Sequence, residues 1–437
     1  MVMNDRYSRR QFIMRAALTV GATVVGPSLI PSLARGADGA VAPSNRITMG
    51  FIGIGGMGTN NLKAFMGRPE VQVVAVCDVD RERRRTARRT VDAFYGKKRR
   101  GSYKGCAAYN DFRELLARGD LDAVMIATPD HWHALIACAA ARAGIDTYCE
   151  KPVGLTIGQG RILSDTMERF GRVFQTGSWQ RSQYNWRHVC ELVRNGRIGK
   201  IHTVRVGLPP GAAIENQPEM RVPAGFDYDL WLGPAPRAPY TKARCHYNFR
   251  YQFDYSGGKP TDWGAHHHDI AQWALGTDRG GPVEVEGRGE FPKEGIFDTA
   301  TQYEFTCTYA DGVRMITKNE HEYGVRFEGS EGWIYISRER WDASPRAVLE
   351  SVIRPEEINL YKSEDHHANF LECLRTRAVT ATPAEIAHRS ISIAHLGNIA
   401  MRLGRKLRWN PQSERFVDDP EADRFLTRSM RGPWQLV

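Results

Sequence analysis

In the first third of the chain, short apolar runs alternate with longer stretches whose apolar residues recur at helical spacing. Apolar runs that end at turn residues are typical of buried strands, and the stretches between them predict helices. The predicted strands are residues 47–54, 71–76, 121–128, 146–149 and 172–176, and the predicted helices are residues 59–66, 112–117, 134–143 and 156–170. This alternation indicates an α/β fold with a doubly wound parallel sheet, which binds ligands at the carboxyl ends of its strands.

After about residue 180 the pattern changes. A helix at 186–195 and a strand at 202–206 precede an irregular segment, residues 208–261, which is rich in proline and aromatic residues. Strand patterns follow at 283–287, 301–308, 313–318, 325–328 and 333–336, and helices at 366–375 and 383–403. This order predicts a C-terminal α+β domain with a large, mostly antiparallel open sheet, whose last helices return to the first domain. The predicted domains are residues 45–178 and 179–405, followed by a C-terminal tail at 406–437.

The first forty residues have the pattern of an export signal. Arg9 and Arg10 precede an apolar stretch, residues 16–33, that glycine and proline residues interrupt. The stretch is too broken for a transmembrane helix, and twin arginines before an apolar run are typical of the twin-arginine export route. We expect residues 1–40 to be a signal peptide, the protein to be periplasmic, and the mature chain to lack an integral membrane domain. The alternative is an N-terminal anchor that is never cleaved.

The composition is that of a globular protein. Of 437 residues, 42% are hydrophobic and 25% are charged, which excludes a disordered chain, a collagen-like chain and a multi-span membrane protein. Much of the net charge of +10 lies in the basic segment 81–104. No nucleic-acid-binding motif accompanies this segment, so we expect a solvated face and no nucleic-acid partner. The eight cysteines form no Cys-x-x-Cys pair, and we expect no disulfides.

Gly53, Gly55 and Gly58 follow the first predicted strand in the pattern G-x-G-x-x-G. In this pattern the first glycine permits a tight turn, the second lets a pyrophosphate approach the backbone, and the third lets helix and strand pack closely. Asp78 ends the second strand, where a carboxylate binds the adenine ribose hydroxyls and repels a 2′-phosphate. We therefore predict a dinucleotide site that prefers NAD to NADP, although the arginines at 81 and 83–85 favour the opposite preference.

Two further motifs stand at predicted strand ends, Thr-Pro-Asp-His-Trp-His at 128–133 and Glu-Lys-Pro at 150–152. With the glycine-rich turn, they resemble the Gfo/Idh/MocA family, which includes glucose–fructose oxidoreductase and inositol dehydrogenase. The resemblance extends through residues 177–182, 257–269 and 395–400. It implies an NAD(P)-dependent oxidoreductase that acts on a hydroxyl or carbonyl of a sugar, cyclitol or glycoside. It also implies a homodimer or homotetramer formed through the C-terminal sheet.

The resemblance assigns roles to individual residues. His266 is expected to carry the proton, since imidazole titrates near neutral pH, and Asp262, on the same face of a predicted helix, to bind and orient the substrate. Lys151 is expected to hydrogen-bond the reacting hydroxyl and the nicotinamide ribose, and to stabilise a developing alkoxide. The other expected cofactor contacts are Gly56, Met57, Thr128, Pro129, His131, His133, Glu150 and Gln180, and the other expected substrate contacts are Arg181 and His267.

Other interpretations stay open at this point. The run from His266 to His268 suggests a metal site, but consecutive helical residues point about 100° apart, and we expect no metal. The same residues could cleave a glycosidic bond by transient oxidation and elimination, with NAD regenerated in place. The chain could also be a non-catalytic carbohydrate-binding protein. Because free NAD is scarce outside the cytoplasm, we expect a tightly bound cofactor, closed over by the aromatic segment 208–261 and a loop after Asp130.

Overall fold

The structure of the protein is a computed structural model that describes residues 45–98 and 104–436. The predicted signal peptide, residues 1–40, and residues 99–103 of the basic segment lie outside the described residues. Residues from Ile47 onward form one structural unit. Within the described residues, no helix is both long and apolar enough to cross a membrane.

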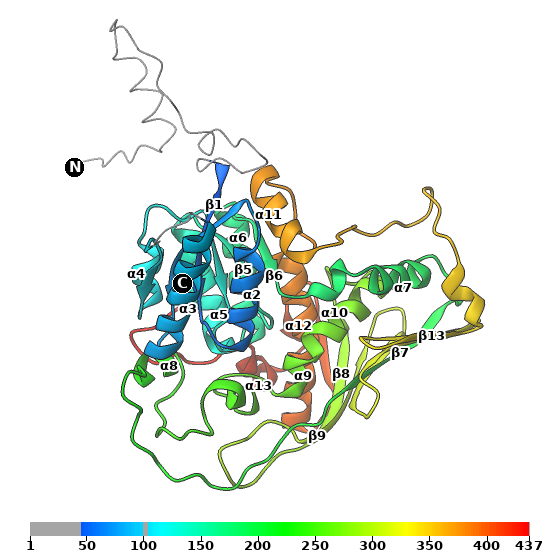
Figure 1. The fold of residues 1–437 in the computed structure, drawn as a ribbon. Coiled ribbons are helices and arrows are strands. Elements are labelled where there is room, and N and C mark those ends of the chain that lie inside the picture. Colours follow the sequence, from blue (N-terminus) through cyan, green and yellow to red (C-terminus); the bar gives the residue numbers. More distant parts are fainter. Residues whose placement is uncertain (1–44, 99–103, 437) are drawn as a thin grey trace, which may run out of the picture. The chain divides into compact units, whose positions relative to one another are not determined.

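The first sheet of this unit, to which the strands labelled β1, β5 and β6 in Figure 1 belong, has six parallel strands in the order β3-β2-β1-β4-β5-β6. The strands are β1 (Ile47–Ile52), β2 (Val71–Cys77), β3 (Ala107–Tyr109), β4 (Ala123–Ile126), β5 (Asp146–Cys149) and β6 (Phe174–Thr176). Helices α2 (Gly56–Met66) and α3 (Arg81–Lys98) cover one face, and α4 (Phe112–Leu116), α5 (Asp130–Arg142) and α6 (Ile157–Arg169) cover the other. The predicted doubly wound parallel sheet is confirmed. The strand order reverses between β1 and β4, so a ligand-binding crevice is expected outside their carboxyl ends.

Consecutive apolar residues in the strands are explained by burial on both faces. Met49 and Phe51 of β1 pack with Phe65 of α2, whereas Ile52 packs on the opposite face with Ile136 of α5. Because successive side chains point to opposite faces, a strand buried on both sides needs an unbroken apolar run. This is the pattern from which the sheet was predicted.

Helix α5 begins earlier than the sequence indicated. The sequence predicted a loop after Asp130 and a helix from residue 134, but α5 begins at Asp130. Pro129 precedes the helix in an extended conformation, and Asp130 places a carboxylate in the first turn, near the positive end of the helix dipole. The prediction of a loop that closes over the cofactor after Asp130 is therefore wrong.

The second sheet has nine strands in the order β13-β12-β11-β7-β10-β9-β8-β14-β15. They are β7 (Ile201–Leu208), β8 (Glu284–Glu290), β9 (Gln302–Thr308), β10 (Arg314–Asn319), β11 (Gly324–Gly329), β12 (Gly332–Ser337), β13 (Trp341–Ser344), β14 (Leu407–Asn410) and β15 (Arg415–Phe416). Strands β7 and β10 pair in parallel and the other pairs are antiparallel, which confirms the predicted mostly antiparallel sheet. Helices α7 (Tyr184–Arg194), α10 (Gly264–Leu275) and α12 (Ala384–Leu403) cover one face with an apolar core. The opposite face carries ion pairs such as Arg205 with Glu328.

The segment 208–261 contains short helices and reaches back to the first domain. Its helices are α8 (Tyr228–Leu232), the 3-10 turn η5 (His246–Tyr251) and α9 (Lys259–Asp262). The backbone N–H of Arg81 donates to the carbonyl of Gly225 at 2.9 Å, and that of Asp227 donates to the carbonyl of Val79 at 3.0 Å. The segment is therefore tied to the loop that follows β2.

The C-terminal segments also join the two domains. In α11 (His366–Thr376), the ring of Phe370 lies 6.1 Å from that of Phe65 and 5.7 Å from that of Tyr148, both in the first domain. Beyond α12, β14 adds to the second sheet, and Trp434 packs edge-on against Trp132 of α5 at 4.7 Å between ring centres. Residues 406–436, a tail in the sequence prediction, are thus part of the fold. The remaining 3-10 turns are η4 (Trp179–Ser182), η6 (Arg346–Glu350) and η7 (Arg424–Leu426).

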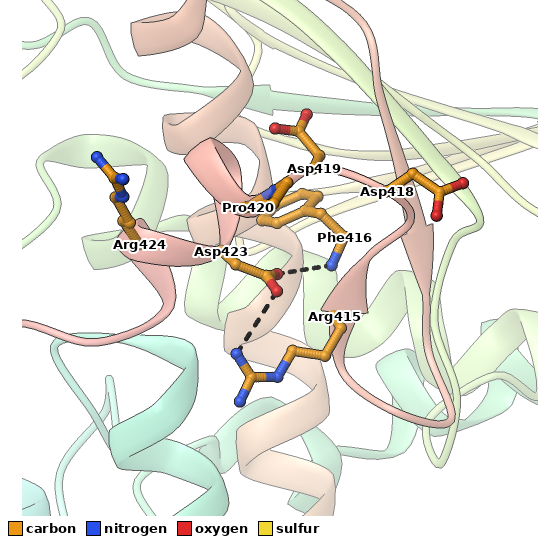
Figure 2. A pocket seen from close by; sticks show the side chains of 7 residues that line it. All are labelled: Arg415, Phe416, Asp418, Asp419, Pro420, Asp423 and Arg424. Carbon is orange, nitrogen blue, oxygen red and sulfur yellow. Dashed lines mark hydrogen bonds and ion pairs between the residues drawn. The ribbon is translucent and has the colours of Figure 1, made fainter.

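A surface hollow lies between β15 and the short helix α13 (Pro420–Asp423) (Figure 2). The carboxylate of Asp423 accepts a hydrogen bond from the backbone N–H of Phe416 at 2.9 Å and lies 3.5 Å from a guanidinium nitrogen of Arg415. These contacts fold the C-terminal turn onto itself. The hollow is lined by residues of this turn alone, and the motifs that the sequence singles out lie elsewhere.

Candidate active site

A cavity of about 720 Å³ lies at the carboxyl ends of the first sheet and continues to the second domain. Its first-domain wall is formed by the residues that follow β1, β2, β4 and β5, and its second-domain wall by the segment 208–261 and the start of α10. This volume is typical of small-molecule and cofactor sites. The carboxyl ends of these strands are also where a doubly wound sheet binds its ligand.

The glycine-rich turn leaves one end of this cavity free for a phosphate. Gly53 has φ of 84°, and a Cβ on it would lie 2.7 Å from backbone atoms of Ala127. A Cβ on Gly58 would lie 1.9 Å from the carbonyl oxygen of Gly53, so Gly58 lets α2 pack against the turn. Gly55 and Gly56 line the cavity at the N-terminus of α2, where free amides and the helix dipole favour an anion. The cradle therefore fits the pyrophosphate of a dinucleotide.

Asp78 lies beside this cradle at the end of β2. Its Oδ2 accepts a hydrogen bond from the backbone N–H of Ile54 at 2.7 Å, and its Oδ1 accepts one from Asp80 at 2.8 Å. Asp78 and Arg83 line the cavity, whereas Arg84 does not line it and donates to the backbone oxygen of Asp78 and to Asn110 Oδ1. The carboxylate is thus held at the place where ribose hydroxyls would bind, and Arg83 is the arginine of the predicted basic cluster that lines the cavity with it.

The two strand-end motifs are fastened to each other. His133 Nδ1 lies 2.7 Å from the carbonyl oxygen of Pro152, and its Nε2 lies 2.8 Å from that of Thr128. Thr128, Pro129 and His133 all line the cavity. Glu150 also lines the cavity and accepts a hydrogen bond from Asn61 Nδ2 at 2.8 Å, while burial raises the pKa of this carboxyl. These residues shape the middle of the cavity.

Lys151 and Asp262 meet at the far end of the cavity. Lys151 Nζ donates to Asp262 Oδ1 at 2.9 Å and to its backbone oxygen at 2.8 Å. Asp262 Oδ2 lies 3.2 Å from Lys259 Nζ and 3.4 Å from Arg250 Nε. Burial opposes ionisation, but Lys151, Arg250 and Lys259 outweigh it and hold the pKa of Asp262 well below its usual value. Asp262 is therefore a carboxylate at neutral pH.

His266 faces the same end of the cavity. Burial, Lys151 and Arg338 all hold the pKa of His266 well below its ordinary value, so its imidazole is neutral. Its Nδ1 is buried without a hydrogen bond to any described residue. Asp262 ends α9 and His266 lies in α10, so the two do not share one helix as predicted. The break at Trp263 nevertheless leaves both side chains on the cavity.

Several predicted contacts lie outside the cavity. Arg181 is 2% exposed and binds both carboxylate oxygens of Asp269 at 2.8 Å. His267 packs against Trp186 and approaches the second sheet, so it does not point into a substrate cleft. The reason is the helical periodicity, which turns neighbouring residues about 100° apart. His131 does not line the cavity, and its Nε2 lies 3.0 Å from the carbonyl oxygen of Trp231. Gln180 and Gly58 also do not line the cavity. The predicted substrate contacts of Arg181 and His267 are therefore not part of this site.

Other residues line the cavity that the sequence did not single out. Arg250 and Arg338 bring guanidinium groups to the end that holds His266, and Trp179 and Trp263 bring aromatic rings. Arg250 lies in the aromatic segment 208–261, and this position was the only indication in the sequence that it could line the site. Arg338 follows β12, and nothing in its local sequence distinguishes it from the neighbouring arginine. Among the described residues, no group of His, Cys, Asp and Glu is arranged to hold a metal ion.

Two family models match this chain. The NAD-binding Rossmann fold of the oxidoreductase family matches residues 47–178, and the C-terminal alpha/beta domain of that family matches residues 210–436. The chain belongs to the Gfo/Idh/MocA family of oxidoreductases. Its first domain is accordingly an NAD-binding domain, and the glycine cradle and Asp78 lie where NAD would be held.

Two curated relatives match part of the chain. A glycosyl hydrolase family 109 protein of Saccharopolyspora erythraea is 34% identical over 36% of this chain and 33% of its own length. An alpha-N-acetylgalactosaminidase of Shewanella oneidensis is 31% identical over 42% of this chain and 39% of its own length. The chain thus spans about a third to two fifths of these curated relatives.

A solved structure is similar over more of the chain. The WlbA dehydrogenase from Bordetella pertussis, in complex with NADH and UDP-GlcNAcA, has 17% sequence identity and a TM-score of 0.61. The similarity covers 84% of this chain and 99% of the dehydrogenase. At this identity the likeness shows the fold, in which a Rossmann domain is followed by a domain with a large sheet.

Proposed function

We propose that this protein is an NAD-dependent oxidoreductase that acts on a hydroxyl or carbonyl of a sugar, cyclitol or glycoside. One observation carries the proposal: Lys151, Asp262 and His266 lie at one end of the cavity whose other end is the glycine cradle. A single cavity can therefore hold the dinucleotide and a small polyol side by side. A non-catalytic binding protein would not need a lysine, a carboxylate and a neutral imidazole at this point.

The cofactor end of the site is built for binding. When bound, NAD supplies the hydride acceptor or donor. The backbone at Gly55 and Gly56 and the N-terminus of α2 would bind the pyrophosphate, and the Asp78 carboxylate would accept hydrogen bonds from the ribose hydroxyls. Gly53, Gly55 and Gly56 carry no side chain, so a phosphate can come close to the backbone of the turn.

The substrate end is built for moving a proton. Neutral His266 can accept the proton of the reacting hydroxyl as its carbon is oxidised, and can return it in the reverse direction. The ammonium group of Lys151 would donate a hydrogen bond to the same oxygen and stabilise negative charge on it. Asp262 holds Lys151 in place through two hydrogen bonds.

The proposal is tested by incubating the purified protein with NAD and a panel of monosaccharides, cyclitols and glycosides. The expected result is formation of reduced nicotinamide, followed by its absorbance, with at least one member of the panel. Wild-type and His266→Ala protein are compared, since a reaction that depends on this site must be lost in the variant. Equal activity of the two proteins would contradict the proposed site.

A second candidate function is NAD-dependent cleavage of a glycosidic bond. Two of the most similar relatives are described as glycosidases, which favours this candidate. The same parts would serve, since transient oxidation acidifies a neighbouring C–H and allows elimination of the aglycone. A chromogenic glycoside distinguishes the two candidates: cleavage without accumulation of reduced nicotinamide supports the glycosidase, and net reduction without cleavage supports the dehydrogenase.

We also propose that the protein is exported by the twin-arginine route with its cofactor already bound. The motif at Arg9 and Arg10 supports the route, and the segment 208–261 supports retention. Phe226, Trp231 and Tyr247 of this segment line the cavity, and the backbone of Phe226 bridges to Asp80.

To test retention, the protein would be isolated from the periplasm, dialysed, denatured and assayed for released nucleotide. Isolated protein that holds almost no nucleotide and binds added NAD weakly would contradict retention of the cofactor. Normal delivery of the double variant Arg9→Lys, Arg10→Lys to the periplasm would contradict the twin-arginine route.

We propose further that the protein is a homodimer or homotetramer that associates through the uncovered face of the second sheet. The charged and aromatic side chains of that face, such as Arg326, Glu328 and Trp333, are suited to a polar interface. Light scattering of wild type and of Trp333→Asp tests this proposal. A monomeric wild type, or a variant with an unchanged mass, would contradict it.

A further inference from the structure

The substrate end of the cavity carries an excess of positive charge. Lys151, Lys259 and Arg250 surround one carboxylate, Asp262, and Arg338 lines the same end. Two other carboxyl groups lie nearby: Asp130, which accepts a hydrogen bond from Ser256, and Glu150, which precedes Lys151 and accepts one from Asn61. Burial raises the pKa of Asp130 to about 7, so this carboxyl contributes at most part of a negative charge at neutral pH. Four cations, Lys151, Lys259, Arg250 and Arg338, thus share this end with one ion-paired carboxylate, Asp262.

Of these four cations, Arg338 is the one that forms no ion pair with a described carboxylate. Its guanidinium carbon lies 4.8 Å from the ring centre of Trp179 and 4.6 Å from that of Trp263. Across residues 45–98 and 104–436, no carboxylate forms an ion pair with it. By contrast, the next arginine on the chain, Arg340, pairs with Glu322 at 2.7 Å. A guanidinium that lies over aromatic rings keeps N–H donors for a planar anionic group.

Arg250 supplies a second donor at this end. Its Nε is buried without a hydrogen bond to a described residue, although it lies 3.4 Å from Asp262 Oδ2. Its guanidinium lies over the ring of Tyr247 at 3.9 Å. An oxidised nicotinamide would add a further positive charge next to Lys151. A substrate that brings a negative charge would therefore gain charge-assisted hydrogen bonds at this end.

We propose that the substrate is an acidic sugar, a sugar or cyclitol unit that carries a carboxylate or a sulfate ester, and that Arg338 binds this anionic group. The inference rests on the proposed function, since it places the reacting hydroxyl at His266 and the acidic group at the nearby guanidinium. Trp179 and Trp263 hold the guanidinium at the cavity wall, and their rings offer apolar faces beside the sugar. Arg250 lies in reach of the same end and strengthens the preference for an anion.

The test uses NAD-loaded protein and matched pairs of ligands. The pairs are glucose and glucuronate, galactose and galacturonate, mannose and mannuronate, and N-acetylglucosamine and its 6-sulfate. Equilibrium binding is measured by calorimetry at low and high salt, so that the readout does not depend on turnover. At least one acidic member is expected to bind about tenfold or more tightly than its neutral counterpart, with a difference that shrinks at high salt. The 6-sulfate pair distinguishes a sulfate ester from a carboxylate.

Variants connect the preference to Arg338. Arg338→Gln is expected to raise KM for the preferred acidic ligand about tenfold or more relative to its effect on KM for the neutral counterpart. Arg338→Lys should restore part of the affinity, since it keeps the charge but not the planar fork. Arg340→Gln, which removes an arginine that is already paired on the protein surface, is the matched control and should behave as wild type.

Two results would overturn the inference. The first is that no acidic member binds, or that neutral members bind as well as their acidic counterparts. The second is that Arg338→Gln weakens acidic and neutral ligands alike. Failure of the proposed function is recognised separately: no member of the panel, acidic or neutral, would then yield reduced nicotinamide in a manner that depends on His266. Oxidation of neutral sugars alone would retain the proposed function and reject the acidic substrate.

Discussion

Lys151 Nζ donates to Asp262 Oδ1 at 2.9 Å and to the backbone oxygen of the same residue at 2.8 Å. Lys151 follows β5 in the first domain, whereas Asp262 ends α9 in the second, 111 residues later. Two hydrogen bonds to one residue fix the direction of the ammonium group. The pair therefore joins the cofactor domain to the substrate domain at the point where the proposed reaction takes place.

Replacing Lys151 should separate its role from that of its neighbour Lys259. Lys151→Ala should lower kcat by about a hundredfold, because it removes the donor to the reacting oxygen, and should also weaken NAD binding. Lys259→Ala removes no donor to the reacting oxygen and leaves Asp262 paired with Lys151 and Arg250, so its effect on kcat should be less than about tenfold. Turnover, NAD affinity and thermal midpoint are measured for both variants. If both variants lose kcat equally at equal stability, the two lysines have the same electrostatic role. That result would contradict a separate role for Lys151 as donor to the reacting oxygen.

Replacing His266 should remove proton transfer while leaving the cofactor site intact. His266→Ala is expected to lower kcat by about a hundredfold or more, with NAD affinity near that of wild type. The pH dependence follows from the depressed pKa of His266, which burial, Lys151 and Arg338 hold well below 6.5. The base is therefore still unprotonated at pH 6.5, and the acid limb of the wild-type profile that belongs to His266 should lie below that value. A variant that keeps the wild-type profile would place proton transfer on another group.

Replacing Asp78 should change the choice of cofactor. Asp78→Ser is expected to weaken NAD binding about tenfold and to improve NADP binding relative to wild type, because the carboxylate accepts ribose hydrogen bonds and repels a 2′-phosphate. Arg83, which also lines the cavity, would then face the phosphate. Asp78→Asn is the matched control, since it removes the charge but keeps an oxygen for the backbone N–H of Ile54. Dissociation constants for both cofactors are measured by calorimetry, and a wild type that already prefers NADP would contradict this interpretation of Asp78.

Two glycines in the same turn should respond differently to alanine. A Cβ on Gly58 would overlap the carbonyl oxygen of Gly53 at 1.9 Å, whereas a Cβ on Gly56 would meet no atom within 4 Å. Gly58→Ala should therefore lower the free energy of unfolding by about 3 kcal/mol, while Gly56→Ala should change it by less than about 0.5 kcal/mol. Chemical denaturation without added NAD measures both. A stable Gly58→Ala protein would mean that the turn can move away from the helix.

The sequence predicted the first domain well because its signals are local. Unbroken apolar runs such as 71–76 indicate strands buried on both faces, and the spacing of Gly53, Gly55 and Gly58 indicates the turn between strand and helix. The start of α5 was missed because the apolar pattern begins at Ala134, whereas the helix is started by Pro129 and Asp130. Helix boundaries depend on such capping interactions, which periodicity does not report.

The sequence by itself determined the alternation of strands and helices in the first domain, the phosphate cradle, and the residue types proposed for proton transfer. Only the tertiary structure decided which side chains share a cavity. It brings Lys151 to Asp262 across 111 residues. It also places Arg338 over the rings of Trp179 and Trp263. Arg181 is turned toward Asp269, and His267 toward the second sheet. The physical reason is that a motif fixes backbone conformation over a few residues, whereas the direction and partners of a side chain depend on elements that pack against it from distant parts of the chain.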